Sequence, residues 1–332
     1  NAKQSIWIEI YRFGKDAMGE RFRMALESKA KEGLEVKILV DAWGTGADIS
    51  FFEPLIKVGV DVRIYRKMKL EKGFLSKNHC RNHRKLIVID SSIGYIGSTN
   101  ITAYCLNWRE LNLRTTDLNL LSIFRRSFKD SYRSFERYTF NKIGTKRDLH
   151  SGDWVFIQDI PGIYRQKIKT KYERMISKAE KEILIETPYF LPGHYLRKLL
   201  CEAAQRGVNV VIITPIHSDV HVVDIIRRHY LGGLHQAGVK LFFYTAGNLH
   251  AKGIMIDQDV FSISSANFDY RSFRYQYELA LIGKEKSLIP QLREHFDSSL
   301  KYCTSFDYQS WKKRSTVERI IELMLLPFRY LF

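Results

Sequence analysis

Apolar strand-like segments alternate with helix-like segments along the chain, and the whole alternation occurs twice. The Ile-rich segment 4–13 has a counterpart at 181–190, and each contains a glutamate, Glu9 or Glu186. Two further pairs of segments each combine a helix end, a glycine and an apolar strand: 30–40 with 204–214, and 55–65 with 234–244. Each half therefore predicts strand, helix, strand, helix, strand, hairpin and helix, which is typical of an α/β sheet with helices on its faces.

The hairpin predicted in each half carries the same four polar residues within apolar sequence. The first hairpin covers 82–100 and the second covers 249–267. The matched residues are 167 positions apart in every case: His83 and His250, Lys85 and Lys252, Asp90 and Asp257, Asn100 and Asn267. Four polar residues that recur in register indicate an internal repeat.

The repeat predicts two similar α/β/α sandwich domains in a pseudo-twofold arrangement, residues 1–150 and 151–332, with a linker at 145–154. A chain of 332 residues is long enough for two such domains. The halves differ mainly just before the hairpin, where the first half has an additional basic segment at 66–82. We expect a monomer that is internally a pseudo-dimer.

The spacing of the first hairpin places its polar residues together. His83 and Lys85 are two positions apart and share one face of a strand. A two-residue turn at 91–92 would place Asn100 opposite His83 and Ser98 opposite Lys85. In the second copy, a turn at 258–259 would make the equivalent pairs: Asn267 with His250, and Ser265 with Lys252.

Such a patch suits phosphate chemistry. Lysine supplies a point charge, while Asn and Ser donate hydrogen bonds to non-bridging oxygens. Of two histidines, one can attack phosphorus and the other can protonate the leaving oxygen. Two fixed cations reduce the need for Mg²⁺, so neither a metal nor a cofactor is expected. For Asp90 and Asp257 we expect a structural role at the strand end, and for Ser98 and Ser265 a structural or supporting role in the motif.

The paired motifs resemble those of the phospholipase D superfamily. Residues 83–85, Asp90 and 97–100 match its HxKx4Dx6GSxN pattern, and the second copy has Ser264 in place of the glycine. Serine is small enough for that position unless the backbone there requires a positive φ. Four flanking segments are similar to bacterial cardiolipin synthases, so that the resemblance covers essentially the whole chain: 107–115, 186–193, 265–273 and 277–282.

The resemblance implies one active site between two phospholipase D-like domains, a phosphohistidine intermediate, and His83 as the nucleophile. It also implies an acidic residue downstream of each motif that orients the histidine. Glu110 and Glu278 fit this role, at 27 and 28 positions after His83 and His250.

The expected function is phosphatidyl transfer, in which two phosphatidylglycerol molecules give cardiolipin and glycerol. Hydrolysis by water, as in a phospholipase D, is one alternative. A nuclease is the other, because some members of the superfamily cut nucleic acid. Small nucleases of this kind usually carry one motif and dimerise, so the duplication favours lipid.

Charge is compatible with each of these functions. The net charge is +17, from 53 Lys and Arg against 36 Asp and Glu, and it favours an anionic partner such as a membrane surface, a phosphate-bearing substrate or nucleic acid.

Four cysteines without a CxxC pair indicate reduced thiols in an intracellular setting: Cys80, Cys105, Cys201 and Cys303. His79, Cys80 and His83 resemble metal ligands, but nothing equivalent precedes His250, so zinc is not expected.

Membrane association is expected at the cytoplasmic face of the bacterial inner membrane. No apolar run reaches the ~18 residues of a spanning helix. The chain opens without Met, almost directly in a strand, which leaves room for an upstream anchor. The C-terminal segment 316–332 follows a basic stretch and predicts a helix that lies on anionic phospholipid together with segment 66–82. The alternative is a core helix that ends at Pro327.

Overall fold

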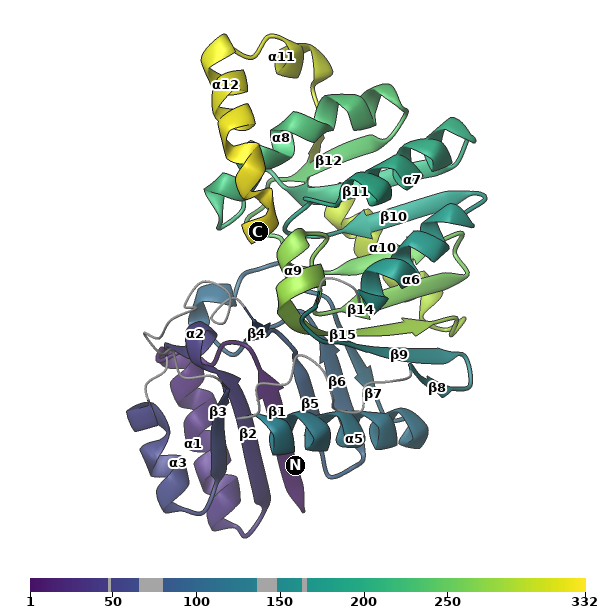
Figure 1. Ribbon diagram of the computed structural model, residues 1–332. Coiled ribbons are helices and arrows are strands. Elements are labelled where there is room, and N and C mark those ends of the chain that lie inside the picture. Colours follow the sequence, from purple (N-terminus) through teal and green to yellow (C-terminus); the bar gives the residue numbers. More distant parts are fainter. Residues whose placement is uncertain (47–48, 66–79, 136–147, 163–165) are drawn as a thin grey trace.

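The computed structural model describes residues 1–46, 49–65, 80–135, 148–162 and 166–332 (Figure 1). Each half of the chain forms a mixed sheet with helices on its faces, which confirms the predicted α/β class. Most of the basic segment predicted at 66–82 lies outside the described residues, as does the start of the linker predicted at 145–154.

The first sheet has the strand order β3-β2-β1-β5-β6-β7. Its strands are β1 (Ser5–Ile10), β2 (Glu35–Asp41), β3 (Asp61–Tyr65), β5 (Leu86–Ile89), β6 (Ile93–Gly97) and β7 (Asn112–Thr115). β1, β2 and β3 are parallel, and β5 pairs antiparallel with β1. The helices of this half are α1 (Ala17–Lys31), α2 (Ala42–Thr45), η1 (Ile49–Phe52), α3 (Glu53–Lys57), η2 (Ala103–Cys105) and α5 (Leu118–Ser134).

Strand β1 is buried on both faces, which is why its sequence is apolar throughout. Ile6, Ile8 and Ile10 pack in the same core as Leu26 of α1. Trp7 points to the other face and stacks on Phe128 of α5, with ring centroids 5.3 Å apart. The first sheet therefore lies between α1 and α5.

The second sheet repeats this order as β12-β11-β10-β13-β14-β15 and extends it at both ends. Its strands are β8 (Leu149–Ser151), β9 (Trp154–Asp159), β10 (Glu182–Glu186), β11 (Asn209–Pro215), β12 (Lys240–Tyr244), β13 (Gly253–Ile256), β14 (Val260–Ser264), β15 (Gln276–Gly283) and β16 (Cys303–Ser305). Its helices are α6 (Lys167–Ser177), α7 (His194–Gln205), α8 (His221–Gln236), α9 (Tyr270–Tyr275), α10 (Ile289–Leu300), α11 (Tyr308–Lys312), α12 (Thr316–Leu325) and η3 (Leu326–Leu331). The domain boundary at 150/151 stays a prediction.

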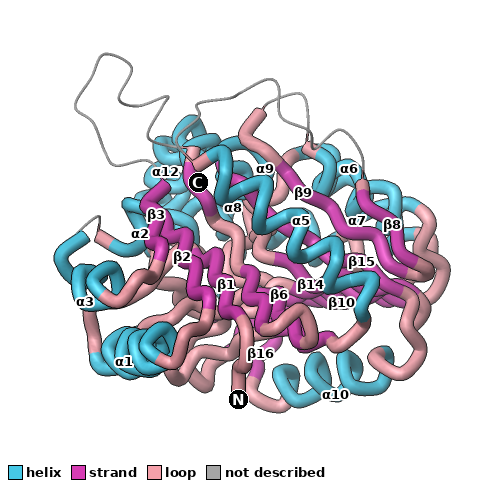
Figure 2. The backbone as a smooth tube through the Cα atoms, turned by 90° about the horizontal axis from the view of Figure 1, so that it is seen from below, coloured by secondary structure: helices cyan, strands magenta, loops and turns pink. Residues whose placement is uncertain are grey.

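The two halves share one apolar core. Side chains of α5 and β5 pack in the same cluster as Phe156, Phe261 and Leu281 of the second sheet. The short strand β4 (Arg81–Asn82) comes from the first half and pairs parallel with β15. Figure 2 shows the strands of both halves through the middle of the molecule with helices around them. This packing holds the two hairpins against each other.

The two-residue hairpin turns predicted from the sequence are wrong by one residue. Ile89 pairs with Ile93, and in the second copy Ile256 pairs with Val260, so each turn contains three residues. The first two residues of each turn have positive φ: Asp90 (53°) and Ser91 (57°), Asp257 (54°) and Gln258 (51°). The predicted pairing of His83 with Asn100 therefore does not form, and the ladder of the first hairpin ends at Leu86 and Ile96.

The two motif aspartates lie at these turns, away from the histidine ends of the hairpins. Asp90 accepts backbone N–H bonds from Lys3, Gln4 and Ser5 at 2.7–2.8 Å. In the second half Asp257 accepts the equivalent three bonds, from Glu180, Lys181 and Glu182 at 2.7–2.9 Å. Each aspartate ties the start of the first strand of its half to its hairpin.

Candidate active site

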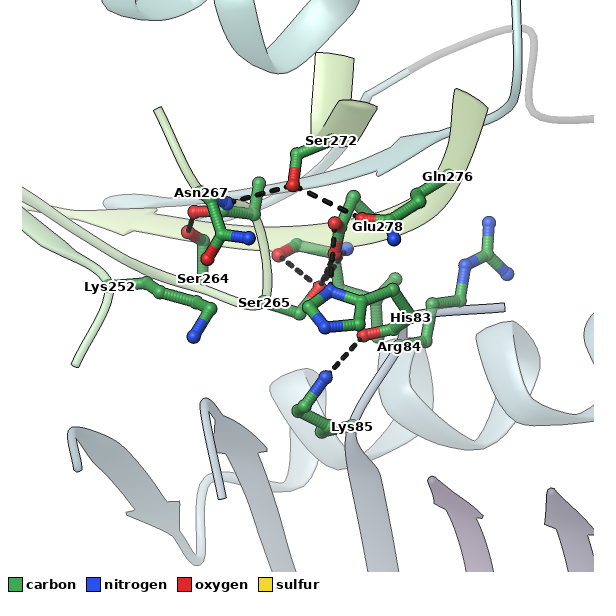
Figure 3. Close-up of polar contacts among 12 residues, drawn as sticks. His83, Arg84, Lys85, Lys252, Ser264, Ser265, Asn267, Ser272, Gln276 and Glu278 are labelled. Carbon is green, nitrogen blue, oxygen red and sulfur yellow. Dashed lines mark hydrogen bonds and ion pairs between the residues drawn. The ribbon is translucent and has the colours of Figure 1, made fainter. Parts of the chain in front are cut away.

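The histidine ends of the two hairpins meet in one pocket between the halves. Its volume is about 260 Å³, and His83, Asn100, His250 and Asn267 all line it. His83 lies between β4 and β5, and His250 lies just before β13. Figure 3 shows Lys85 and Lys252 approaching His83 from the two halves. The structure therefore brings together the histidines, lysines and asparagines that the repeat singled out, whereas the two aspartates lie at the hairpin turns.

Each histidine is held by a glutamate from the opposite half. His83 Nδ1 lies 2.9 Å from Oε1 of Glu278, a residue near the start of β15. His250 Nδ1 lies 2.9 and 3.0 Å from the two carboxylate oxygens of Glu110, just before β7. A carboxylate on Nδ1 fixes the tautomer, so that Nε2 of each ring is the reactive nitrogen.

An aromatic ring that the sequence motif did not reveal lines the pocket next to each histidine. Tyr11, at the end of β1, meets His83 edge-on with ring centroids 4.9 Å apart. Trp108 meets His250 edge-on at 5.2 Å. Trp108 is two positions before Glu110. Its closeness in sequence to the predicted acid was the signal that could have identified it as a residue of the site.

The two lysines are almost fully buried and aligned by the backbone. Lys85 Nζ donates to the carbonyl oxygen of His83 at 2.8 Å, and Lys252 Nζ donates to that of His250 at 2.7 Å. Burial lowers the pKa of Lys85 to about 7 and that of Lys252 to about 8, although nearby carboxylates oppose the shift. A phosphate anion in the pocket favours their charged forms.

The two asparagines present amide groups to the pocket. The Asn100 side-chain oxygen accepts the backbone N–H of Arg12 at 3.2 Å, which leaves its NH₂ group for a ligand. Asn267 is 4% exposed, and its Oδ1 has no hydrogen-bond partner among the described residues. Asn100 thus has a donor group available for a substrate, whereas Asn267 has an acceptor, because its NH₂ group donates to the Asp269 carboxylate.

The motif serines serve the strands rather than the pocket. Ser98 Oγ donates to the Leu111 carbonyl oxygen at 3.1 Å and accepts the Leu111 N–H at 2.9 Å. Ser265 Oγ donates to Glu278 Oε2 at 2.5 Å and accepts the Leu279 N–H at 2.9 Å. Both hydroxyls thus brace the segments that carry the glutamates and are not directed to a phosphate.

The electrostatic environments of the two histidine–glutamate pairs differ. Burial raises the pKa of Glu278 well above its usual value, and Lys85 offsets only part of this. Burial acts on Glu110 in the same direction, but the charge and hydrogen bond of His250 outweigh it and lower the pKa to about 2. Burial and then Lys85 lower the pKa of His83 well below its usual value. Burial also lowers the pKa of His250, but Glu110 opposes the shift.

No three or more His, Cys, Asp or Glu side chains gather as a metal site among the residues that the structure describes. His79, one of the three residues that resembled metal ligands, lies outside that part of the chain. The four cysteines, all of them among the described residues, form no disulfide, and Cys80 and Cys105 are buried.

Comparisons with known proteins agree with the motif. The family model "Cardiolipin synthase, PLD-like domain" matches residues 1–132 and 172–300. A cardiolipin synthase of Clostridium perfringens is 32% identical over 339 residues, which cover 98% of this chain and 71% of the relative. The major cardiolipin synthase ClsA of Bacillus subtilis is 32% identical over 336 residues, which cover 97% and 69%.

A similar fold occurs in the crystal structure of a phosphatidylserine synthase from Haemophilus influenzae. The TM-score is 0.78 at 13% identity, and the match covers all of this chain and 91% of the other. That likeness concerns the fold, whereas the sequence relatives and the family model identify the family. The chain belongs to the cardiolipin synthase family of the phospholipase D superfamily.

Proposed function

We propose that the protein is a phosphatidyltransferase that joins two phosphatidylglycerol molecules into cardiolipin and releases glycerol. The family supports transfer of a phosphatidyl group between phospholipids. The observation that carries the proposal is the pair of buried histidines in one pocket, each held through Nδ1 by a glutamate of the other half.

In the first step, Nε2 of His83 attacks the phosphorus of one phosphatidylglycerol. The bond between phosphorus and the head-group oxygen breaks, and His250 gives its proton to that oxygen, so that glycerol leaves. In the second step His250 removes the proton from a head-group hydroxyl of the second lipid. This hydroxyl attacks phosphorus, the phosphorus–nitrogen bond breaks, and His83 is restored.

The different environments support this division of roles. A nucleophile must be uncharged, and His83 is the histidine whose pKa is lowered well below its usual value. A general acid must carry a proton, and the ionised Glu110 favours the protonated form of His250. Lys85, Lys252 and the NH₂ group of Asn100 then stabilise the negative charge on the non-bridging oxygens.

The test is to incubate the protein with phosphatidylglycerol vesicles and to identify the products by mass spectrometry. We expect equal amounts of cardiolipin and glycerol, and no product from the His83→Ala variant. Phosphatidic acid as the sole lipid product would favour the hydrolase instead. Efficient cleavage of single-stranded DNA without any lipid product would favour the nuclease.

Phospholipid substrates imply an enzyme that works at a membrane. Among the described residues, every helix is too short or too polar to cross a bilayer. We propose that the protein acts as a monomer on anionic phospholipid at the cytoplasmic face of the inner membrane. The internal repeat supports the monomer, because one chain supplies both histidines.

A further inference from the structure

Helix α12 turns its apolar side outward. Four apolar residues share one face of the helix, because they recur at intervals of three and four positions: Val317, Ile320, Ile321 and Met324. Their exposed fractions are 65, 50, 42 and 68%, and Phe328 of η3 continues the row at 52%. An amphipathic helix that only stabilised the fold would turn this row inward. We call these five residues the apolar row.

The two glutamates of the same helix pair with arginines of the protein. Glu322 is 1% exposed and forms an ion pair with Arg314 at 3.0 Å. Glu318 lies 3.5 Å from Arg228 of α8 and also completes the capping box with Ser315. These contacts fix the rotation of α12, so the outward direction of the apolar row is built into the fold.

The apolar row leads to the mouth of the active-site pocket. Phe332 lines the pocket, and its carbonyl oxygen accepts the N–H of Arg271 at 2.8 Å. From the first half, Trp43 and Tyr104 line the same pocket and are 43 and 53% exposed. Arg271 connects the two sides, because its guanidinium group lies 5.3 Å from the centroid of the Trp43 ring. Apolar groups thus surround the mouth from both halves.

The pocket is too small for a whole phospholipid. Its volume of about 260 Å³ is below the ~300–1,000 Å³ of pockets that enclose drug-sized ligands. A phosphoglycerol head group fits this space, but two acyl chains do not. The chains of a bound lipid must therefore stay in an apolar phase directly outside the mouth.

We propose that the apolar row and the rim residues Trp43 and Tyr104 form one docking surface that seats the pocket mouth on an anionic bilayer. Three basic residues are exposed beside the row, Lys312, Lys313 and Arg319, while both glutamates of α12 are paired with arginines. A basic flank with an apolar insertion face is what an anionic interface binds. The inference rests on the proposed lipid substrate.

The test compares Ile320→Gln/Met324→Gln with the control Leu118→Gln. Leu118 is 73% exposed at the start of α5, and it is not part of the docking surface. Binding to vesicles of phosphatidylglycerol and phosphatidylcholine is measured in about 0.5 M salt, where surface charges are screened. We expect binding of the double variant to fall about tenfold or more, because apolar insertion is lost, and the control to bind like the parent.

Activity on short-chain phosphatidylglycerol, dispersed as monomers, should be equal in all three proteins, because none of the changes touches the pocket. A second measurement uses Phe328→Trp, whose additional fluorescence should be quenched by brominated lipid. Unchanged vesicle binding of the double variant, or no added quenching, would overturn the inference. So would a dimer of the parent that the double variant loses while it still binds vesicles.

A parent protein that is inactive on both vesicle and monomeric phosphatidylglycerol would refute the proposed function. The binding and quenching measurements would still decide the docking surface, because neither depends on turnover.

Discussion

At the scale of single residues, the two histidines occupy equivalent sequence positions but different electrostatic environments. The glutamate on His83 is fully buried, and its pKa is raised. The glutamate on His250 is partly exposed, at 10% of its side chain, and has a lowered pKa. An internal repeat thus places its two histidines in different environments, and the proposed division of roles makes use of that difference.

The division of roles predicts different responses to a better leaving group. His83→Ala and His250→Ala should each lower turnover of phosphatidylglycerol by at least ~10²–10⁴-fold. With a phosphatidyl ester of p-nitrophenol, which needs no protonation to leave, His250→Ala should still release nitrophenol and accumulate phosphohistidine. His83→Ala should do neither. Phosphohistidine found on His250 in rapid-quench mass spectrometry would reverse the assignment.

The two glutamates should affect stability with opposite signs. The pKa of Glu110 is about 2 when folded against 4.5 ordinarily, so its contribution is present above about pH 4.5 and is lost as the pH falls towards 2. The pKa of Glu278 is raised, so its charged form costs stability at neutral pH. At pH 7, Glu110→Gln should lower Tm and Glu278→Gln should raise it, as measured by calorimetry. Equal shifts of the same sign would contradict this.

The sequence revealed which residues form the site but not how they pair. The repeat singles out His83 and His250, and the resemblance adds Glu110 and Glu278. Spacing along the chain is nearly equal in the two halves, so it is compatible with pairing within a half or across halves. Only the packing of the two halves, through β4 on β15, decides for the crossed arrangement.

At the scale of elements, the two hairpins differ at one backbone position. Gly97 has a φ of 158°, and a Cβ there would lie 2.3 Å from the carbonyl oxygen of Leu111. Ser264 occupies the matching position of the second hairpin without a positive φ. The departure from the family pattern at Ser264 is therefore compatible with its backbone.

This difference predicts that replacing the residue of one repeat by that of the other changes the free energy of unfolding unequally. Gly97→Ser should lower the free energy of unfolding by ~2–4 kcal/mol, because the new side chain meets backbone that cannot move away. The matched change Ser264→Gly should cost about 1 kcal/mol or less. Urea unfolding of both variants measures the contrast, and similar costs would show that the first hairpin relaxes.

The hairpin register could not be predicted because the turns use unusual residues. Asp90 and Ser91 both adopt positive φ, as do Asp257 and Gln258, where glycine or asparagine is the common choice. Because neither turn contains glycine or asparagine, the sequence favoured a two-residue turn over the three-residue turn that forms. For α12 the sequence left two alternatives, an interfacial helix and a core helix, since a periodic apolar row predicts a face but not what covers it.

At the scale of the whole molecule, each half contributes one buried lysine, and we expect the two lysines to replace the cation that phosphate chemistry often requires. Turnover of phosphatidylglycerol should therefore be unchanged in EDTA, whereas Lys85→Met and Lys252→Met should each reduce it by about 10²-fold or more. The assay is cardiolipin formation in detergent micelles with and without chelator. Loss of activity in EDTA that a divalent ion restores would contradict the expectation.

The crossed histidine–glutamate pairs also have consequences for the concentration dependence of activity and for the evolution of the duplicated chain. A single half holds a histidine whose carboxylate partner is on the other half, so a one-motif chain of this geometry completes its centre only by meeting a twin. Such an enzyme would lose activity on dilution. Joining both halves in one chain removes that dependence, and it frees the two copies to diverge, as the unequal surroundings of Glu110 and Glu278 already show.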